Sequence, residues 1–203
     1  MAETKSIKVV QVQMNPIRKD TLASLAAASH HLQNFSAADN IDLVIFPELC
    51  FSGYFFADHE DVAPVLEYSN EGPTFDFCSA QAIRLESYVI CSYPEKDRLL
   101  EKTSYISQMV IGPDGALLKS YRKHLLWLVH DPAWATAGPG WETFDLKNRQ
   151  GVVLKVGLGV CNDLWANGQG RDHMDLARFW RDQGCDVIAF STNFPFAPTQ
   201  CRR

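Results

Sequence analysis

Apolar runs alternate along the chain with amphipathic segments, and this alternation predicts strands that alternate with helices. The runs at 7–14, 43–46, 88–93, 152–160 and 186–190 are rich in branched and aromatic residues and have the length of strands. Between the first two runs, the segment 21–35 places Leu22, Leu25 and Leu32 on one helical face, and Asp20 precedes it as the expected amino-terminal cap. The pattern predicts an α/β fold.

Two further helices complete this pattern. Gly72-Pro-Thr opens a helix that is expected to run to about Glu86, with Thr74 as its cap. Another helix is expected near 173–183. Each lies between two strand candidates, as the connections of an α/β sheet require.

A hairpin and a long irregular segment occupy the middle of the chain. The strand candidates 103–111 and 116–121 flank Gly112-Pro-Asp-Gly, in which proline presets one turn dihedral and Gly115 accepts a positive one. Residues 125–142 contain two prolines, two glycines and three tryptophans, and their apolar positions match neither the helical nor the strand period. We expect a loop there that covers the mouth of a site.

Three side chains of types that can take part in catalysis follow the predicted strands. Glu48 comes after the run 43–46, Lys123 after the second hairpin strand, and Cys161 after 152–160. Open α/β sheets bind ligands at the carboxyl ends of their strands. A thiol needs a base to become a nucleophile, and a buried cation can hold an oxyanion. The sequence therefore indicates a candidate thiol-dependent site.

Composition narrows the possible functions. The chain has 203 residues, of which 46% are hydrophobic and 21% charged, so a single domain over 1–203 is expected. Its net charge of -5 and scattered cations disfavour binding to nucleic acid or to an anionic membrane. The amino terminus lacks the apolar core of a signal peptide, and no run is long enough to span a bilayer, which favours the cytoplasm. Six cysteines without zinc or disulfide spacing are expected to be mostly buried, reduced thiols.

Each candidate also has an ordinary structural interpretation. Taken alone, Cys161 is more often a buried structural thiol, Glu48 a turn carboxylate, and Lys123 part of a solvated basic pair with Arg122. The three together favour a functional interpretation. Asp163 can be a ligand for a substrate ammonium or the cap of the turn that follows the strand, and the sequence leaves both open.

The residues around these three side chains resemble the signature of the nitrilase superfamily of carbon-nitrogen hydrolases. The matching segments are Phe46-Pro-Glu-Leu, Tyr121-Arg-Lys and Gly159-Val-Cys-Asn-Asp. The resemblance implies an α-β-β-α sandwich of two mixed sheets. It also implies that Glu48, Lys123 and Cys161 are catalytic.

Within the superfamily, the chain is most similar to the amino-terminal amidases of fungi and other eukaryotes. The segments that carry this similarity are Phe51-Ser-Gly-Tyr-Phe-Phe, Glu71-Gly-Pro-Thr-Phe and Ser92-Tyr-Pro-Glu. Those enzymes deamidate an amino-terminal Asn or Gln of a protein and feed the degradation pathway that reads terminal residues. The partner implied is a protein or peptide amino terminus.

The resemblance assigns a role to each residue. Glu48 takes the thiol proton, Cys161 forms a thioester as ammonia leaves, and Lys123 stabilises the oxyanion together with the backbone N–H of Asn162. No metal or organic cofactor is implied. Where the family usually has a second glutamate, this chain offers Asp131, one methylene shorter.

Two aromatic residues complete the expected pocket. Tyr54 and Trp165 are candidates for its walls, and Trp165 is the stronger one because it lies only four positions after Cys161. Aromatic residues at this density also occur in cores and lids, so their assignment stays open.

Two alternatives to an amino-terminal amidase remain. The first is a related amidase that acts on a small free amide, nitrile or carbamoyl amine. The second starts from the end of the chain soon after Asn193, where the family continues with a carboxyl-terminal portion. We expect an incomplete sandwich, which is either catalytically silent or an assembly partner, and a second chain or an oligomer is possible at the exposed sheet edge.

Overall fold

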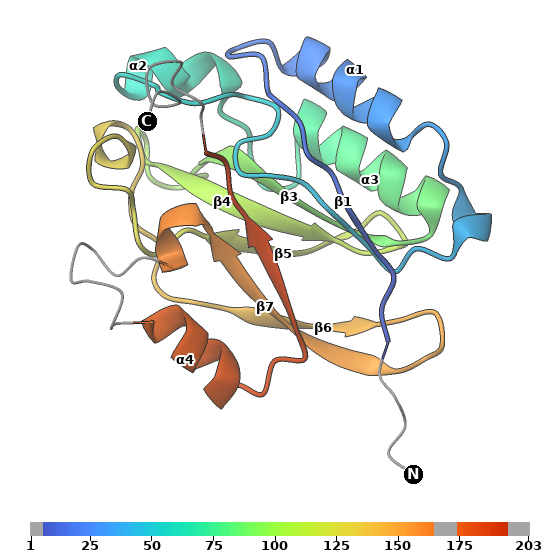
Figure 1. The fold of residues 1–203 in the computed structure, drawn as a ribbon. Coiled ribbons are helices and arrows are strands. Elements are labelled where there is room, and N and C mark those ends of the chain that lie inside the picture. Colours follow the sequence, from blue (N-terminus) through green and yellow to red (C-terminus); the bar gives the residue numbers. More distant parts are fainter. Residues whose placement is uncertain (1–5, 165–173, 195–203) are drawn as a thin grey trace, which may run out of the picture.

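Two β-sheets packed face to face, with helices on both outer sides, make up the computed structural model, which describes residues 6–164 and 174–194 (Figure 1). The helices are α1 (Thr21–Leu32), α2 (His59–Val62), α3 (Pro73–Leu85) and α4 (Asp175–Asp182). The strands are β1 (Val9–Gln11), β2 (Leu43–Ile45), β3 (Tyr88–Lys96), β4 (Ser104–Ile111), β5 (Leu117–Arg122), β6 (Thr143–Lys147), β7 (Val153–Val160) and β8 (Val187–Ser191). The expected α-β-β-α sandwich is confirmed.

Both sheets are mixed, as expected. The five-stranded sheet has the order β1-β2-β3-β4-β5, with β1, β2 and β3 parallel and β3, β4 and β5 antiparallel. Strand β5 therefore runs in the same direction as β2, and the carboxyl ends of both strands lie on the same side of the sheet. The three-stranded sheet has the order β6-β7-β8, and β7 and β8 are parallel.

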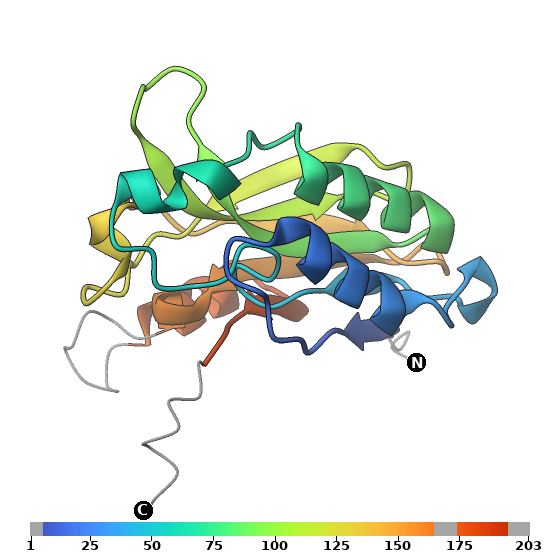
Figure 2. The ribbon, with the colours of Figure 1, turned by 90° about the horizontal axis from the view of Figure 1, so that it is seen from above.

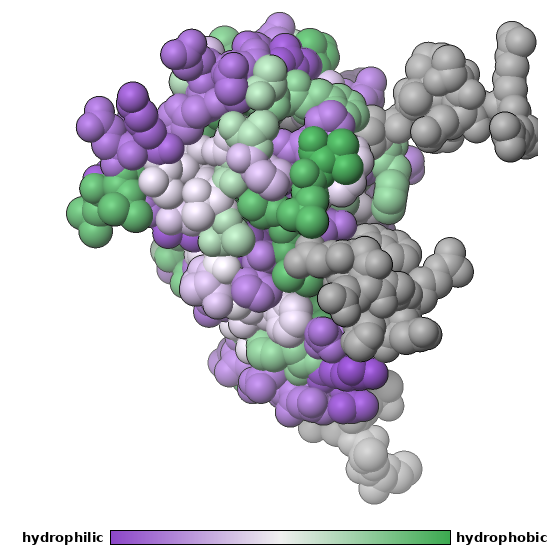
Figure 3. Space-filling model, turned by 90° about the vertical axis from the view of Figure 1, so that its left-hand side faces the viewer, coloured by the Kyte–Doolittle hydropathy of each residue, from purple (hydrophilic) through white to green (hydrophobic). Residues whose placement is uncertain are grey.

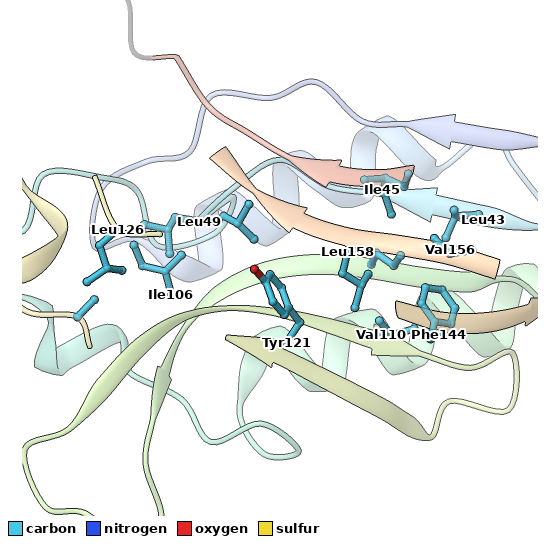
Figure 4. Packing of buried hydrophobic residues seen from close by; sticks show 14 of the residues in the cluster. Leu43, Ile45, Leu49, Ile106, Val110, Tyr121, Leu126, Phe144, Val156 and Leu158 are labelled. Carbon is cyan, nitrogen blue, oxygen red and sulfur yellow. The ribbon is translucent and has the colours of Figure 1, made fainter. Parts of the chain in front are cut away.

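The alternation of side chains along β2 divides the core into two layers. Leu43 and Ile45 face the other sheet and pack in one cluster with Leu158 of β7 (Figure 4). Val44 and Phe46 face the opposite way, into the cluster under α1 and α3. Viewed from the second direction, the two helices lie along the same side of the five-stranded sheet (Figure 2). The strand is buried on both faces, which explains why its sequence is continuously apolar.

Helix α4 covers the outer face of the three-stranded sheet with two buried side chains, Leu176 and Trp180. Trp180 lies against Gly157 and Gly159, where an added Cβ atom would come within 2.3 Å and 2.9 Å of the indole. Its Nε1 donates to the Leu158 carbonyl at 3.1 Å. The two glycines of β7 thus allow the indole to lie close to the backbone of the strand that leads to Cys161.

The element bounds agree with the sequence in most places, and four details differ. Asp20 caps α1 as expected, accepting from Ala23 N at 3.0 Å. The cap of α3 is Gly72, and Thr74 instead donates its Oγ1 hydrogen to Glu67 at 2.7 Å, because that buried carboxylate lies at the helix start. The first strand is shorter than predicted, and neither α2 nor β6 was predicted.

The cysteines in the described part of the chain form no disulfide bonds. Cys50, Cys78 and Cys91 are buried, while Cys161 and Cys185 are partly exposed. Cys201 lies outside the described residues. Among the helices of residues 6–164 and 174–194, none is long and apolar enough to cross a membrane.

Candidate active site

Glu48 lies just beyond the end of β2, in a tight turn that buries it. Only 1% of Glu48 is exposed. The hydroxyl of Tyr54 lies 2.8 Å from the main-chain oxygen of Glu48 and 2.7 Å from its Oε2, so it holds one side of the carboxylate. Leu49 and Phe55, which flank this turn, have left-handed backbone conformations with φ of 46° and 61°. Such conformations in non-glycine residues cluster at functional sites.

Lys123 lies between two buried carboxylates. It follows β5, and its backbone N–H still donates to Ile106 of β4 at 2.8 Å. Its Nζ lies 2.8 Å from Glu48 Oε1 and 2.7 Å from Asp131 Oδ2. Lys123 is 1% exposed and Asp131 8% exposed. One cation thus faces two carboxylates in a desolvated cluster, which has an excess of negative charge unless one carboxylate is protonated.

The loop after Lys123 brings Asp131 back to it. Trp127 N donates to Asp131 Oδ2 at 2.7 Å, and Gly138 N donates to the Lys123 carbonyl at 2.8 Å. A Cβ atom at position 138 would lie 2.1 Å from the Arg122 carbonyl oxygen, so this return requires glycine. The loop is irregular, as predicted, apart from one 3₁₀ turn at Asp131–Ala133.

The outer side of this loop is apolar. Leu128 and Val129 are 67% and 70% exposed, and Phe55, 47% exposed, packs its ring 5.1 Å from that of His130. On this side of the molecule, hydrophobic residues lie among hydrophilic ones (Figure 3). The loop therefore carries Asp131 into the buried cluster and exposes apolar side chains to solvent.

Cys161 ends β7 in a strained turn. Its φ is 42°, and it begins a 3₁₀ turn that extends to Leu164. The side-chain Nδ2 of Asn162 in this turn donates to the Leu126 carbonyl at 2.8 Å. A left-handed conformation is uncommon for a residue other than glycine, and here it places the thiol at the end of the strand, beside the Glu48 and Lys123 side chains.

Asp163 joins the turn of the thiol to the segment that follows β5. Its Oδ2 accepts from Tyr121 OH at 2.7 Å and Val160 N at 2.9 Å. Its Oδ1 accepts from His124 N at 3.0 Å and Leu125 N at 2.8 Å. The carboxylate is 1% exposed and both oxygens are occupied, which favours the turn cap over the ammonium ligand.

Burial and mutual charge shift the pKa values of this cluster. Burial raises the pKa of Glu48 against the opposing attraction of Lys123. Burial alone would lower the pKa of Lys123, but Glu48 and Asp131 more than offset this, so its pKa is raised and the lysine stays charged. Burial and the Glu48 charge raise the pKa of the Cys161 thiol to about 12, while Lys123 and Thr192 act in the opposite direction. The resting cluster therefore holds a thiol next to a carboxylate with raised basicity.

The structure brings together most of the side chains selected from the sequence. Tyr54, Glu48, Lys123 and Asp131 form a continuous hydrogen-bonded chain, and Cys161 lies close enough for its pKa to respond to two of them. Trp165 lies outside the described residues. Sequence reasoning missed Thr192, although its position directly after the strand that pairs with β7 was a usable signal.

A cleft of about 960 Å³ opens beside this cluster. Pro47 and Thr192, neighbours of the cluster in sequence and in space, line it, but the side chains of Glu48, Lys123 and Cys161 do not. Within residues 6–164 and 174–194, no group of three His, Cys, Asp or Glu side chains is arranged to hold a metal ion.

Comparisons with known proteins show the family to which the chain belongs. Residues 8–197 match the carbon-nitrogen hydrolase family model. The protein N-terminal amidase of Saccharomyces cerevisiae is 28% identical over 202 residues, which cover 90% of this chain and 44% of that one. A nitrilase of Pyrococcus abyssi is 30% identical, and the match covers 95% of this chain and 68% of the relative. The chain thus spans about half the length of its amidase relative.

Solved structures of N-terminal amidases share the fold. One with a Gln-Val peptide superposes with a TM-score of 0.84 at 23% identity, over 97% of this chain and 51% of that one. Another, with an Asn-Glu-Ala peptide, has a TM-score of 0.80 at 24% identity, with the same coverage. With a family model matched over nearly its whole length, the chain belongs to the carbon-nitrogen hydrolase family.

Proposed function

We propose that this chain hydrolyses a carboxamide through a thioester on Cys161 and releases ammonia. The observation that carries the proposal is the buried Glu48–Lys123–Asp131 cluster, with separations of 2.8 Å and 2.7 Å, next to the strand-end thiol. A thiol of raised pKa needs a base, and the adjacent carboxylate has the raised pKa that suits a base near neutral pH. Lys123 supplies a fixed positive charge.

The reaction follows from these positions. Glu48 takes the proton from Cys161 as sulfur attacks the amide carbon, and Lys123 with the backbone N–H of Asn162 holds the oxyanion. Glu48 then passes its proton to the leaving nitrogen, and ammonia departs as the thioester forms. Water, deprotonated by Glu48, attacks the thioester and releases the carboxylic acid and the thiol. Asp131 keeps Lys123 in place.

We further propose that the carboxamide belongs to an amino-terminal Asn or Gln of a protein or peptide. The name of the yeast relative and the Asn and Gln peptides in the two solved structures support this substrate class. The excess of carboxylates over cations in the cluster suits a substrate that carries an ammonium group. Its product would have an acidic first residue, and we place the reaction in the cytoplasm, upstream of degradation that reads terminal residues.

Peptides that begin with Asn or Gln should release ammonia, and the same peptides acetylated at the amino terminus should react at least about tenfold more slowly, since a charge-assisted contact is lost. Both are compared with a small free amide and a nitrile in an ammonia assay. Turnover of the small compounds with indifference to a peptide chain would favour the nitrilase-like alternative instead. If folded protein releases no ammonia from any of these compounds, both the amino-terminal amidase and the nitrilase-like alternative are ruled out.

Tyr54→Phe should move the acid limb of the kcat/KM profile to higher pH by roughly 0.5 to 1 unit. The Tyr54 hydroxyl lowers the pKa of Glu48, so its loss raises that pKa further. Glu48 then stays protonated, and cannot act as a base, up to a higher pH. Tyr88→Phe is the control, because its hydroxyl contacts Lys147 N at 3.2 Å, at the opposite end of the sheets. An unmoved limb in Tyr54→Phe would contradict Glu48 as the base.

A further inference from the structure

Thr192 occupies a fixed position beside the thiol. In the register of β7 and β8, Val160 pairs with Ser191, and Cys161 and Thr192 directly follow this pair at adjacent strand ends. Ser191 is locked in place, since its Oγ donates to the Phe46 carbonyl at 2.8 Å and accepts from Gln108 Nε2 at 2.9 Å. The backbone that carries Thr192 is thereby tied to the strand before Glu48.

The hydroxyl of Thr192 is buried without being satisfied. Among the described residues, its Oγ1 has no hydrogen-bond partner of good geometry. A buried polar group in this state typically costs about 1–3 kcal/mol, and such groups in native structures call for an explanation. Valine has nearly the same shape and would avoid this cost, so packing alone does not account for threonine here.

The Cys161 thiol is within reach of this hydroxyl, because the two residues follow paired positions of β7 and β8. After burial and the Glu48 charge, which raise the pKa of Cys161, the Thr192 hydroxyl and Lys123 are groups that lower it. Lys123 already contacts Glu48 and Asp131. A neutral thiol sulfur is a weak acceptor, whereas a thiolate accepts strongly, so the hydroxyl contributes little at rest and more once the sulfur is charged.

We propose that Thr192 is a further catalytic residue, whose Oγ–H donates a hydrogen bond to the Cys161 sulfur when the thiol proton has moved to Glu48. This inference rests on the proposed function. The hydroxyl keeps its own proton throughout: the S–H bond breaks, the proton goes to the Glu48 carboxylate, and the sulfur electron pair forms the S–C bond. When water later displaces the thiolate from the thioester, the hydroxyl again donates a hydrogen bond to the negatively charged sulfur. A contact stronger in the charged state than at rest accelerates both steps.

The test measures the rate at which iodoacetamide alkylates Cys161 in the full chain near neutral pH, with peptide mapping to identify the thiol. Thr192→Val should slow this rate about tenfold, as expected when a hydrogen bond to a charged group is lost. Thr192→Ser should stay within about twofold of the unmodified chain, because it keeps the hydroxyl. Thr143→Val makes the same substitution in the same sheet, at the start of β6, and should change nothing. Alkylation of Cys185 in each sample provides an internal reference.

Several results would overturn the inference. If Thr192→Val is alkylated at the rate of the unmodified chain, the proposed hydrogen bond is ruled out. If Thr192→Ser is slowed as much as Thr192→Val, the effect is due to packing. Slower ammonia release with unchanged alkylation would make Thr192 a substrate contact. Thr192→Ala gives the same comparison if the valine variant does not fold. Ammonia release that continues after complete alkylation of Cys161 would instead overturn the proposed function itself.

Discussion

Cys161→Ala is expected to lower the rate of ammonia release from Asn- or Gln-initiated peptides on the order of 10⁵-fold, the scale seen when covalent catalysts lose their nucleophile. Glu48, Lys123 and Asp131 would remain in place and still bind the carboxamide. They would have no sulfur with which to form a thioester. Binding and catalysis should therefore separate, with little change in peptide affinity.

The stability of this variant distinguishes loss of chemistry from loss of fold. Cys161 is partly exposed, so truncation to alanine should change the free energy of unfolding by less than about 1 kcal/mol. Cys185→Ala, a change at another partly exposed thiol, should leave ammonia release intact. Activity retained by Cys161→Ala would show that another group attacks the amide.

The sequence predicts those parts of the site that depend on short-range patterns. The buried run before Glu48 alternates between two apolar clusters, and such a run can be recognised as a strand from its composition. The same holds for β7, where glycines interrupt the pattern at the positions against which Trp180 packs. Once strands are recognised, their ends and the residues that follow them can be located.

Long-range contacts could not be predicted from such patterns. Asp131 reaches Lys123 through an irregular loop that depends on the close return at Gly138, and no period in the sequence reports that return. From the sequence, Asp163 fits a ligand as well as a cap, because its four donors come from two segments that are far apart in the chain. Strand β6 has the alternation of a half-buried strand, but its five residues are too few to stand out beside the loop.

Lys123→Met is expected to lower the free energy of unfolding by about 3–5 kcal/mol at neutral pH, the usual cost of removing one partner of a buried ion pair. Glu48 and Asp131 would then be buried together without a cation. Methionine fills a similar volume, so the loss reflects charge and not a cavity. Urea unfolding, followed by circular dichroism, measures it. Lys119→Met is the matched control. The side chains of Lys119 and its partner Glu142 are 30% and 33% exposed, and ion pairs this exposed contribute about 1 kcal/mol or less to stability.

The pH dependence of this loss identifies its cause. The pKa of Glu48 is already raised by burial, and removing Lys123 takes away the attraction that opposes the rise. As pH falls through that raised pKa, Glu48 becomes neutral in the variant, and one of the two uncompensated negative charges disappears. The difference between the two proteins should therefore shrink on going from neutral to mildly acidic pH.

A double variant tests the same electrostatic origin at constant pH. Glu48→Gln removes one of the two carboxylate charges, so Glu48→Gln/Lys123→Met should be more stable than Lys123→Met alone, with a coupling of at least about 1 kcal/mol between the two sites. Additive losses, or a Lys123→Met variant as stable as Lys119→Met, would contradict a shared buried charge cluster. The coupling would tie the fold to the chemistry, because the lysine that offsets two buried carboxylates is also the cation assigned to the oxyanion.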